Sequence, residues 1–167
     1  MNMTMIAGRL CTVPKIKLLE LDKKTVRVCK IAVAVVNELF DSMDEAALTE
    51  ENVDFFQCIA FGNTAKMISD NFVKGARIVL YGKMRNHRFE DANAAKHFTN
   101  VLLIEKTEFG DTEAMVCKFS EKRKHTDLSI MSDLKELYDL YDRVCMNGFL
   151  CIDEDDYYNI ATSNMVI

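Results

Sequence analysis

The chain has 167 residues, a formal net charge of −5, 49% hydrophobic residues and 28% charged residues. This composition is typical of a soluble globular protein, and the length suits one domain with a small appendage. No apolar run approaches the roughly 20 residues that cross a membrane, and the N-terminus lacks the basic and then apolar order of a secretory signal. We therefore expect a cytoplasmic protein with no membrane partner.

The six cysteines and three histidines of the chain do not have the spacing of a zinc site or of a CxxC redox motif. Cys11, Cys29 and Cys58 lie in apolar, strand-like segments. We expect reduced and largely buried thiols, as in cytosolic proteins, and no metal or nucleotide cofactor. A metal site or a redox role is the alternative.

The charge is distributed unevenly along the chain. Residues 1–110 hold 15 basic and 14 acidic residues, whereas residues 111–167 hold 6 and 12. No Lys or Arg occurs between Lys30 and Lys66, and this gap contains seven acidic residues, without which residues 1–110 would carry +8. A basic surface is therefore possible despite the negative net charge, provided that the acidic loop at residues 37–52 points away from it.

Five segments have the β-branched, apolar or alternating character of strands. The first two are separated by a turn or short extension around the only proline, Pro14, and by the turn-like Asp22-Lys23-Lys24. The predicted strands cover residues 3–12, 25–36, 53–62, 77–89 and 97–106.

One helix is predicted between the third and fourth strands, because Ala65, Ile68 and Phe72 follow a helical period. Asn63 or Thr64 can cap its start, and Gly75 supplies a left-handed stop. A small antiparallel sheet must close or cover its edges. The order β-β-β-α-β-β predicts an all-β OB-fold, a five-stranded and partly open barrel with one helix between strands 3 and 4.

The pattern changes after Gly110. A short charged linker leads to a predicted helix at residues 127–147, and an acidic cluster follows at residues 153–156. We therefore divide the chain into an OB-fold domain, residues 1–110, and a C-terminal helical and acidic extension, residues 111–167. The helix has an apolar stripe, which we expect to pack against its own domain or a sister subunit. The stripe consists of Ile130, Leu134, Leu137, Tyr141 and Val144.

Two predicted strands carry rings and cations on the face that does not point to the core. In residues 53–62, Phe55 and Phe61 share a face with Gln57 between them. In residues 77–89, the corresponding face ends at Phe89 and also carries Arg77, Val79, Tyr81, Lys83, Arg85 and His87. Rings stack on bases, at about 1–3 kcal/mol per base, and cations contact phosphates. Such a face favours single-stranded nucleic acid and little sequence preference.

The alternative is an ordinary sheet in which rings fill the core and cations form a solvated face. We assign Phe56, Phe72 and Phe98 to the core. No catalytic triad order, phosphate-binding glycine loop or metal spacing is present, which argues against an enzyme. An OB-fold protein-interaction module, or a replication accessory factor that binds DNA or RNA weakly, remains the alternative function.

Four segments of residues 1–110 together resemble the bacterial single-stranded-DNA-binding proteins. The longest one combines Phe55, Phe61-Gly62, a helix, Lys74-Gly75, Gly82, basic residues and Phe89. The four segments read GRLCTVPKIK, VCKIAVAVVN, VDFFQCIAFGNTAKMISDNFVKGARIVLYGKMRNHRFED and KHFTNVLLIEKTEFG.

The resemblance implies an OB-fold homotetramer that wraps single-stranded DNA during replication, recombination and repair, in the cytoplasm on the nucleoid. It implies base stacking by Phe55, Phe61 and Phe89, with Phe40 as a fourth ring. It implies phosphate contacts by Lys74, Arg85, Arg88, Lys83, Arg77 and Arg9.

The chain departs from this pattern at several places. It has no Trp, and Gln57 and Asn63 are neutral where relatives often carry a base, so we expect a weaker grip. Phe56 stands where a polar residue is commoner, near the implied subunit contacts. The acidic cluster resembles the tail tip that recruits replication and repair proteins. A negatively charged tail could also compete with DNA for the basic groove.

Overall fold

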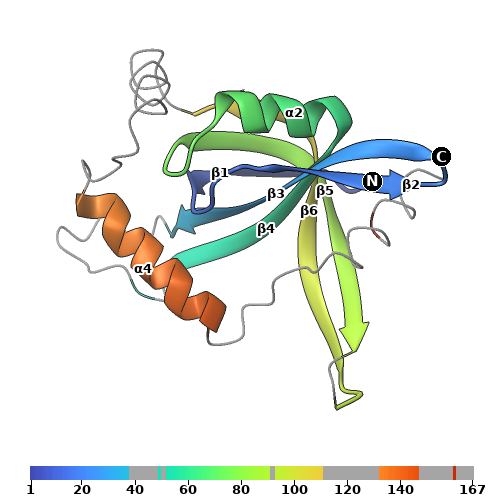
Figure 1. The fold of residues 1–167 in the computed structure, drawn as a ribbon. Helices are drawn as coiled ribbons and strands as arrows, with labels where there is room; N and C mark the ends of the chain where they lie inside the picture. Colours follow the sequence, from blue (N-terminus) through green and yellow to red (C-terminus); the bar gives the residue numbers. More distant parts are fainter. Residues whose placement is uncertain (38–48, 50–51, 91–92, 111–131, 147–159, 161–167) are drawn as a thin grey trace.

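The structure, a computed structural model, describes residues 1–37, 49, 52–90, 93–110, 132–146 and 160. One sheet of six strands has the order β1-β5-β6-β4-β3-β2 and closes into a barrel through β1 and β3 (Figure 1). The one helix described between β4 and β5 is α2, as the OB-fold prediction requires. The elements are β1 Thr4–Leu10, β2 Ile16–Leu21, β3 Lys24–Val36, β4 Val53–Phe61, α2 Gly62–Asn71, β5 Arg77–Glu90, β6 Lys96–Phe109 and α4 Ser132–Met146.

Strand β2 was not predicted as a strand. It forms a hairpin with β3 whose turn residues, Asp22 and Lys23, have φ of 41° and 71°, as two-residue hairpin turns require. Both β1 and β2 pair with β3, at Arg9↔Ala34 and Ile16↔Cys29. The two strands are therefore consecutive segments of one barrel strand, interrupted near the proline, and the five-stranded barrel is retained.

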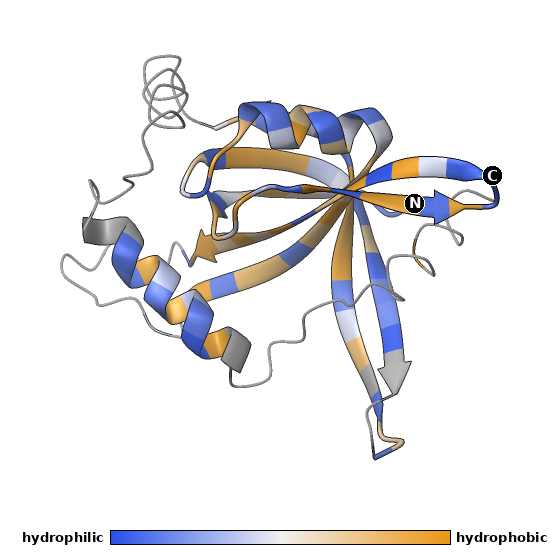
Figure 2. Cartoon of the chain, viewed as in Figure 1, coloured by the Kyte–Doolittle hydropathy of each residue, from blue (hydrophilic) through white to orange (hydrophobic). Residues whose placement is uncertain are grey.

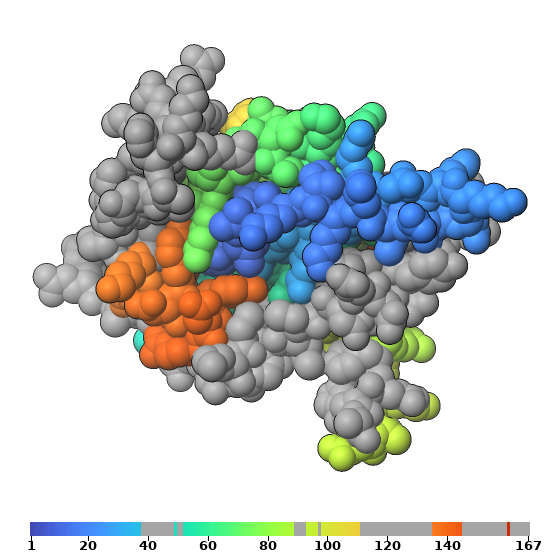
Figure 3. All heavy atoms as spheres, in the orientation of Figure 1, coloured from blue at the N-terminus to red at the C-terminus, as the bar shows by residue number. Residues whose placement is uncertain are grey.

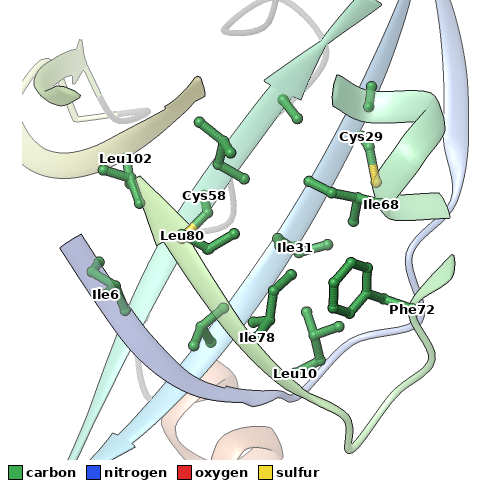
Figure 4. Close-up of a cluster of buried hydrophobic side chains, with 14 of the residues drawn as sticks. Ile6, Leu10, Cys29, Ile31, Cys58, Ile68, Phe72, Ile78, Leu80 and Leu102 are labelled. Carbon is green, nitrogen blue, oxygen red and sulfur yellow. The ribbon is translucent and has the colours of Figure 1, made fainter. Parts of the chain in front are cut away.

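The barrel interior is filled by alternate residues of the strands, and α2 covers one of its ends. Cys58 of β4 points inward (Figure 4), and Phe56 and Ala60 of the same strand belong to or pack against the same core cluster, as the alternation predicted. The same cluster includes Ile68 of α2 and Phe72, which is 1% exposed. Phe56 and Phe72 are thus in the core, as expected.

The predicted caps of α2 are wrong. The N-cap residue is Phe61, with no side-chain cap hydrogen bond, because Gly62 at φ 61° turns the chain directly from strand to helix. Asn63 and Thr64 consequently lie inside the first turn. The helix ends at Asn71, and Gly75, with φ 93°, belongs to the turn that follows.

The assignment of Phe98 to the core is also wrong, because its side chain is 67% exposed. It lies on β6 where the β5–β6 hairpin extends beyond the barrel (Figure 1). Outside the barrel neither face of a strand meets the core, so the alternation no longer indicates burial. His87, expected on the outward face of β5, is buried at 8% exposure.

Strand β5 bends around the barrel at Gly82. The β5–β6 register shifts between Tyr81 and Gly82, which marks a β-bulge or similar irregularity. A Cβ atom at Gly82 would lie 1.9 Å from the Leu103 carbonyl oxygen. Only glycine therefore permits this close approach of the two backbones.

Cys11, Cys29 and Cys58 form no disulfide and are buried, as expected for these three residues. Burial raises the pKa of the Cys29 thiol to about 11 and raises that of Cys58 further. Among the described residues no group of three His, Cys, Asp or Glu side chains could hold a metal ion. Neither described helix is long and apolar enough to span a membrane.

The contrast between two phenylalanines tests this packing. Phe72→Ala should lower the free energy of unfolding by about 3–5 kcal/mol, because it leaves a cavity in the core. Phe98→Ala is the matched control and should change it by less than about 0.5 kcal/mol, as exposed positions do. Urea unfolding followed by circular dichroism measures both. Equal losses would contradict the assignment of Phe72 to the core and Phe98 to the surface.

Candidate nucleic-acid interface

The site is built on the face of β4 that points away from the barrel interior. Successive side chains of a strand alternate between faces, so Phe55, Gln57, Ile59 and Phe61 lie opposite the inward residues of β4. Residues directly paired on adjacent strands share a face. We call this surface, with the paired residues of the neighbouring strands, the outer face.

The strand register places cations beside these residues in four rows. Arg9 aligns with the row of Phe55, Arg85 with that of Gln57, and Lys83 with that of Ile59. The rows are Arg9–Ala34–Phe55, Ala32–Gln57–Val101–Arg85, Lys30–Ile59–Leu103–Lys83 and Lys17–Val28–Phe61. The outer face therefore alternates apolar, aromatic and cationic groups.

Two of these cations, Lys17 and Lys30, were not among the predicted site residues. Lys30 is half-buried and Lys17 is exposed. The signal for Lys30 was present in the sequence, since it is the one cation inside the long apolar run of β3. The alignment of Lys30 with Ile59 depended on knowing which strands pair, and Lys17 lies on the strand that was not predicted.

The predicted rings Phe55 and Phe61 lie outside the barrel, but both are half-buried. The Phe55 ring lies 5.4 Å from the Tyr141 ring of α4, tilted by 57°. Phe61 packs beside a cluster that includes Ile59, Val101 and Ile160. The two rings point away from the core, as predicted, but they are not bare toward solvent, because residues of the C-terminal extension lie against them.

The two other predicted rings are Phe89 and Phe40. Phe89 is in β5, opposite His97 of β6, in the projecting hairpin; its side chain lies outside the described part of the structure. Phe40, with the acidic loop at 38–48, also lies outside the described residues.

Three predicted cations gather near the start of β5. Arg9 donates a hydrogen bond from Nη1 to the Gly75 carbonyl oxygen, 2.9 Å away. It pairs in register with Arg77, and both line a pocket of ≈ 340 Å³ to which Leu137 of α4 also contributes. Lys74 Nζ lies 3.9 Å from the centroid of the Tyr138 ring.

The remaining predicted cations lie along β5. Lys83 forms a salt bridge of 2.7 Å with Glu105, both partly exposed. Arg85 is exposed, and Arg88, on the projecting hairpin, lies 5.4 Å from the centroid of the Phe98 ring. Arg9, Lys74 and Arg77 thus lie beside α4, as Phe55 does. Lys83 and Arg85 lie along the outer face, and Arg88 and Phe89 lie farther out on the hairpin.

Tyr138 stays neutral in this setting. Burial, and to a smaller extent Cys11, raise its pKa to about 12, while the nearby Arg9 guanidinium acts in the opposite direction. Its hydroxyl has no hydrogen-bond partner among the described residues.

Comparison with known proteins identifies the family. Residues 1–110 match the model of the single-strand binding protein family. The chain belongs to the single-strand binding protein family. The predicted resemblance is thereby confirmed over most of the chain.

Two relatives agree with this assignment. A single-stranded DNA-binding protein of Fusobacterium nucleatum subsp. nucleatum is 32% identical over 113 residues, which cover 68% of this chain and 69% of the relative. A single-stranded DNA-binding protein of Clostridium perfringens is 29% identical over 112 residues, 67% of each chain. The match to the single-strand binding protein family includes every predicted contact residue, whereas α4 and Ile160 lie beyond it.

Proposed function

We propose that the chain binds single-stranded DNA on the outer face, with little sequence preference, and protects it during replication, recombination and repair. The observation that supports this most directly is the row pattern, in which Phe55 and Phe61 share one face with cations from neighbouring strands. Membership of the single-strand binding protein family agrees with it. Proteins of this family are DNA-binding and non-enzymatic, in agreement with the absence of a catalytic motif.

The rings would supply most of the base contacts. Phe55 and Phe61 are six residues apart on one strand, so about 20 Å separates them at roughly 3.3 Å per residue, and several unstacked bases can lie between. Each stacked base contributes about 1–3 kcal/mol. Phe89 on the hairpin and Phe40 would add further stacking positions. Every base has a flat face, and this explains the low sequence preference.

The cations would hold the phosphates. Arg9 and Arg77 face each other across β1 and β5, and two neighbouring guanidinium groups can bind one phosphate through charge-assisted hydrogen bonds. The other cations that we propose as phosphate contacts lie along the outer face and the hairpin. They are Lys17, Lys30, Lys74, Lys83, Arg85 and Arg88.

We further propose that the protein works as a homotetramer on the nucleoid in the cytoplasm, and that residues 111–167 contact replication and repair proteins. The family assignment supports the tetramer in general terms. The acidic cluster at 153–156, which would make the protein contacts, lies outside the described residues.

The contribution of stacking is tested by Phe61→Ala. Loss of one ring should weaken binding to oligo(dT) by about 5- to 150-fold, which corresponds to 1–3 kcal/mol. Leu18→Ala is the control, because Leu18 is 68% exposed and lies on the opposite face of β2 from Lys17. Fluorescence anisotropy with labelled oligo(dT), and with oligo(U) to compare RNA, measures both. Unchanged affinity of Phe61→Ala would remove this ring from the interface.

The newly identified cations are tested by the double variant Lys17→Ala and Lys30→Ala. Each lost phosphate contact should reduce the slope of log K against log salt by about 0.7 for single strands, so we expect a slope that is smaller by about 1.4. Lys66→Ala on α2 is the control, since Lys66 is paired with Asp70 one helical turn away. An equal slope for the double variant and the wild type would place these lysines off the DNA path.

A further inference from the structure

Helix α4 of the C-terminal extension lies directly on the outer face. Its Leu137, Leu140 and Tyr141 are buried in one cluster with residues of β3, β4 and the segment after β1, and Phe55 packs against this cluster. In Figure 3 the atoms of α4 lie against those of the barrel, beside β1. The cluster partners on the barrel are Cys11, Ala32, Ala34 and Val53.

Two tyrosines of α4 contact the two kinds of group that are proposed to bind DNA, a ring and a cation. Tyr141 contacts the ring of Phe55, and Tyr138, three residues earlier on the same helix face, lies over the ammonium group of Lys74. Leu137 lines the pocket that contains Arg9 and Arg77. A base on Phe55 and a phosphate at Lys74 would therefore need the space that α4 fills.

We propose that α4 is a displaceable cover of the single-stranded-DNA site, closed in the free protein and moved aside when DNA binds. This inference rests on the proposed function, because it concerns the same face. Tyr141 takes the place of a stacked base and Tyr138 faces the cation that a phosphate would face. The helix and the DNA strand thus exclude each other.

Two buried polar groups, one on the outer face and one on α4, are left without partners. Gln57, between Phe55 and Phe61, is 2% exposed, and neither its amide nitrogen nor its amide oxygen has a hydrogen-bond partner in the described part of the chain. The same holds for the buried Tyr138 hydroxyl. Unsatisfied buried polar groups destabilise the state that contains them. The Tyr138 hydroxyl therefore makes the closed state easier to open than its apolar contacts alone indicate.

The contact between α4 and the outer face is apolar and aromatic. A cover of this kind differs from an acidic tail, which would compete with DNA through its charge. Lys135, Glu136, Asp139 and Asp142 of α4 are exposed, and Figure 2 shows hydrophilic and hydrophobic residues alternating along this helix. Salt screens exposed charges but weakens apolar burial little. Opening the cover should therefore increase DNA affinity at high salt as well as at low salt.

The first experiment loosens the cover in the full chain. Leu137→Ala with Leu140→Ala removes the packing but keeps the helix propensity. We expect oligo(dT) to bind about tenfold tighter or more at both low and high salt, because the fraction of binding-competent protein rises. Lys135→Ala with Glu136→Ala removes one charge of each sign from exposed positions and should leave the affinity unchanged. A gain that vanishes at high salt, or no gain, would overturn the proposal.

The second experiment strengthens the cover. Tyr138→Phe removes the unpartnered hydroxyl and keeps the ring, so it should stabilise the closed state and weaken oligo(dT) binding. Tighter or equal binding by Tyr138→Phe would contradict the closed arrangement.

Hydrogen exchange of the wild-type protein tests the displacement without any substitution. Amides of α4 should exchange faster when oligo(dT) is added to saturation, while those of β3 and β4 should not. Unchanged or slower exchange in α4, with DNA bound, would show that the helix is not displaced and would overturn this inference alone. If neither the wild type nor the loosened variant binds oligo(dT), the proposed function fails, and the cover fails with it.

Discussion

The alternation of side chains along β4 is the constraint on which the rest of the structure depends. Its inward residues, such as Cys58, complete the core that closes the barrel, and this fixes the outward direction of Phe55, Gln57 and Phe61. Because the barrel fixes the backbone of β4, the spacing between the rings is fixed before any ligand arrives. The register then brings cations from β1, β2, β3 and β5 to the same surface. The alternation of side chains along β4 therefore determines both the core packing and the proposed interface.

An outer face of this kind has a difficulty that a purely basic groove does not have. It carries large apolar groups that water solvates poorly, and apolar surfaces of this kind attract other chains unless they are covered. Helix α4 reduces the exposure of Phe55 with residues of similar chemistry. The properties that suit the face to unstacked bases, flat rings flanked by cations, also suit it to a helix that presents tyrosines. Competition between the two is a consequence of the chemistry of the face.

The sequence predicted the features that depend on local periodicity. The barrel strands, the outward placement of Phe55 and Phe61, and most of the apolar stripe of α4 follow from periods of two and about 3.6 residues. The errors arose where burial or strand pairing depends on tertiary contacts. Phe98 keeps the alternation of a core strand but lies beyond the barrel, and β2 depends on its pairing with β3. The partial burial of Phe55 depends on where α4 docks, and no local pattern contains that information.

The contact between α4 and the outer face contributes only a modest free energy, and its proposed role depends on this. Burial of one Leu side chain contributes about 1.5–3 kcal/mol, whereas an unsatisfied buried polar group opposes it by about 1–3 kcal/mol. The unpartnered Tyr138 hydroxyl therefore offsets part of what Leu137 and Leu140 contribute. A few stacked bases, each at about 1–3 kcal/mol, have the same magnitude as the remainder. The helix is held strongly enough to cover Phe55 in the free protein, and weakly enough that a single DNA strand can replace it.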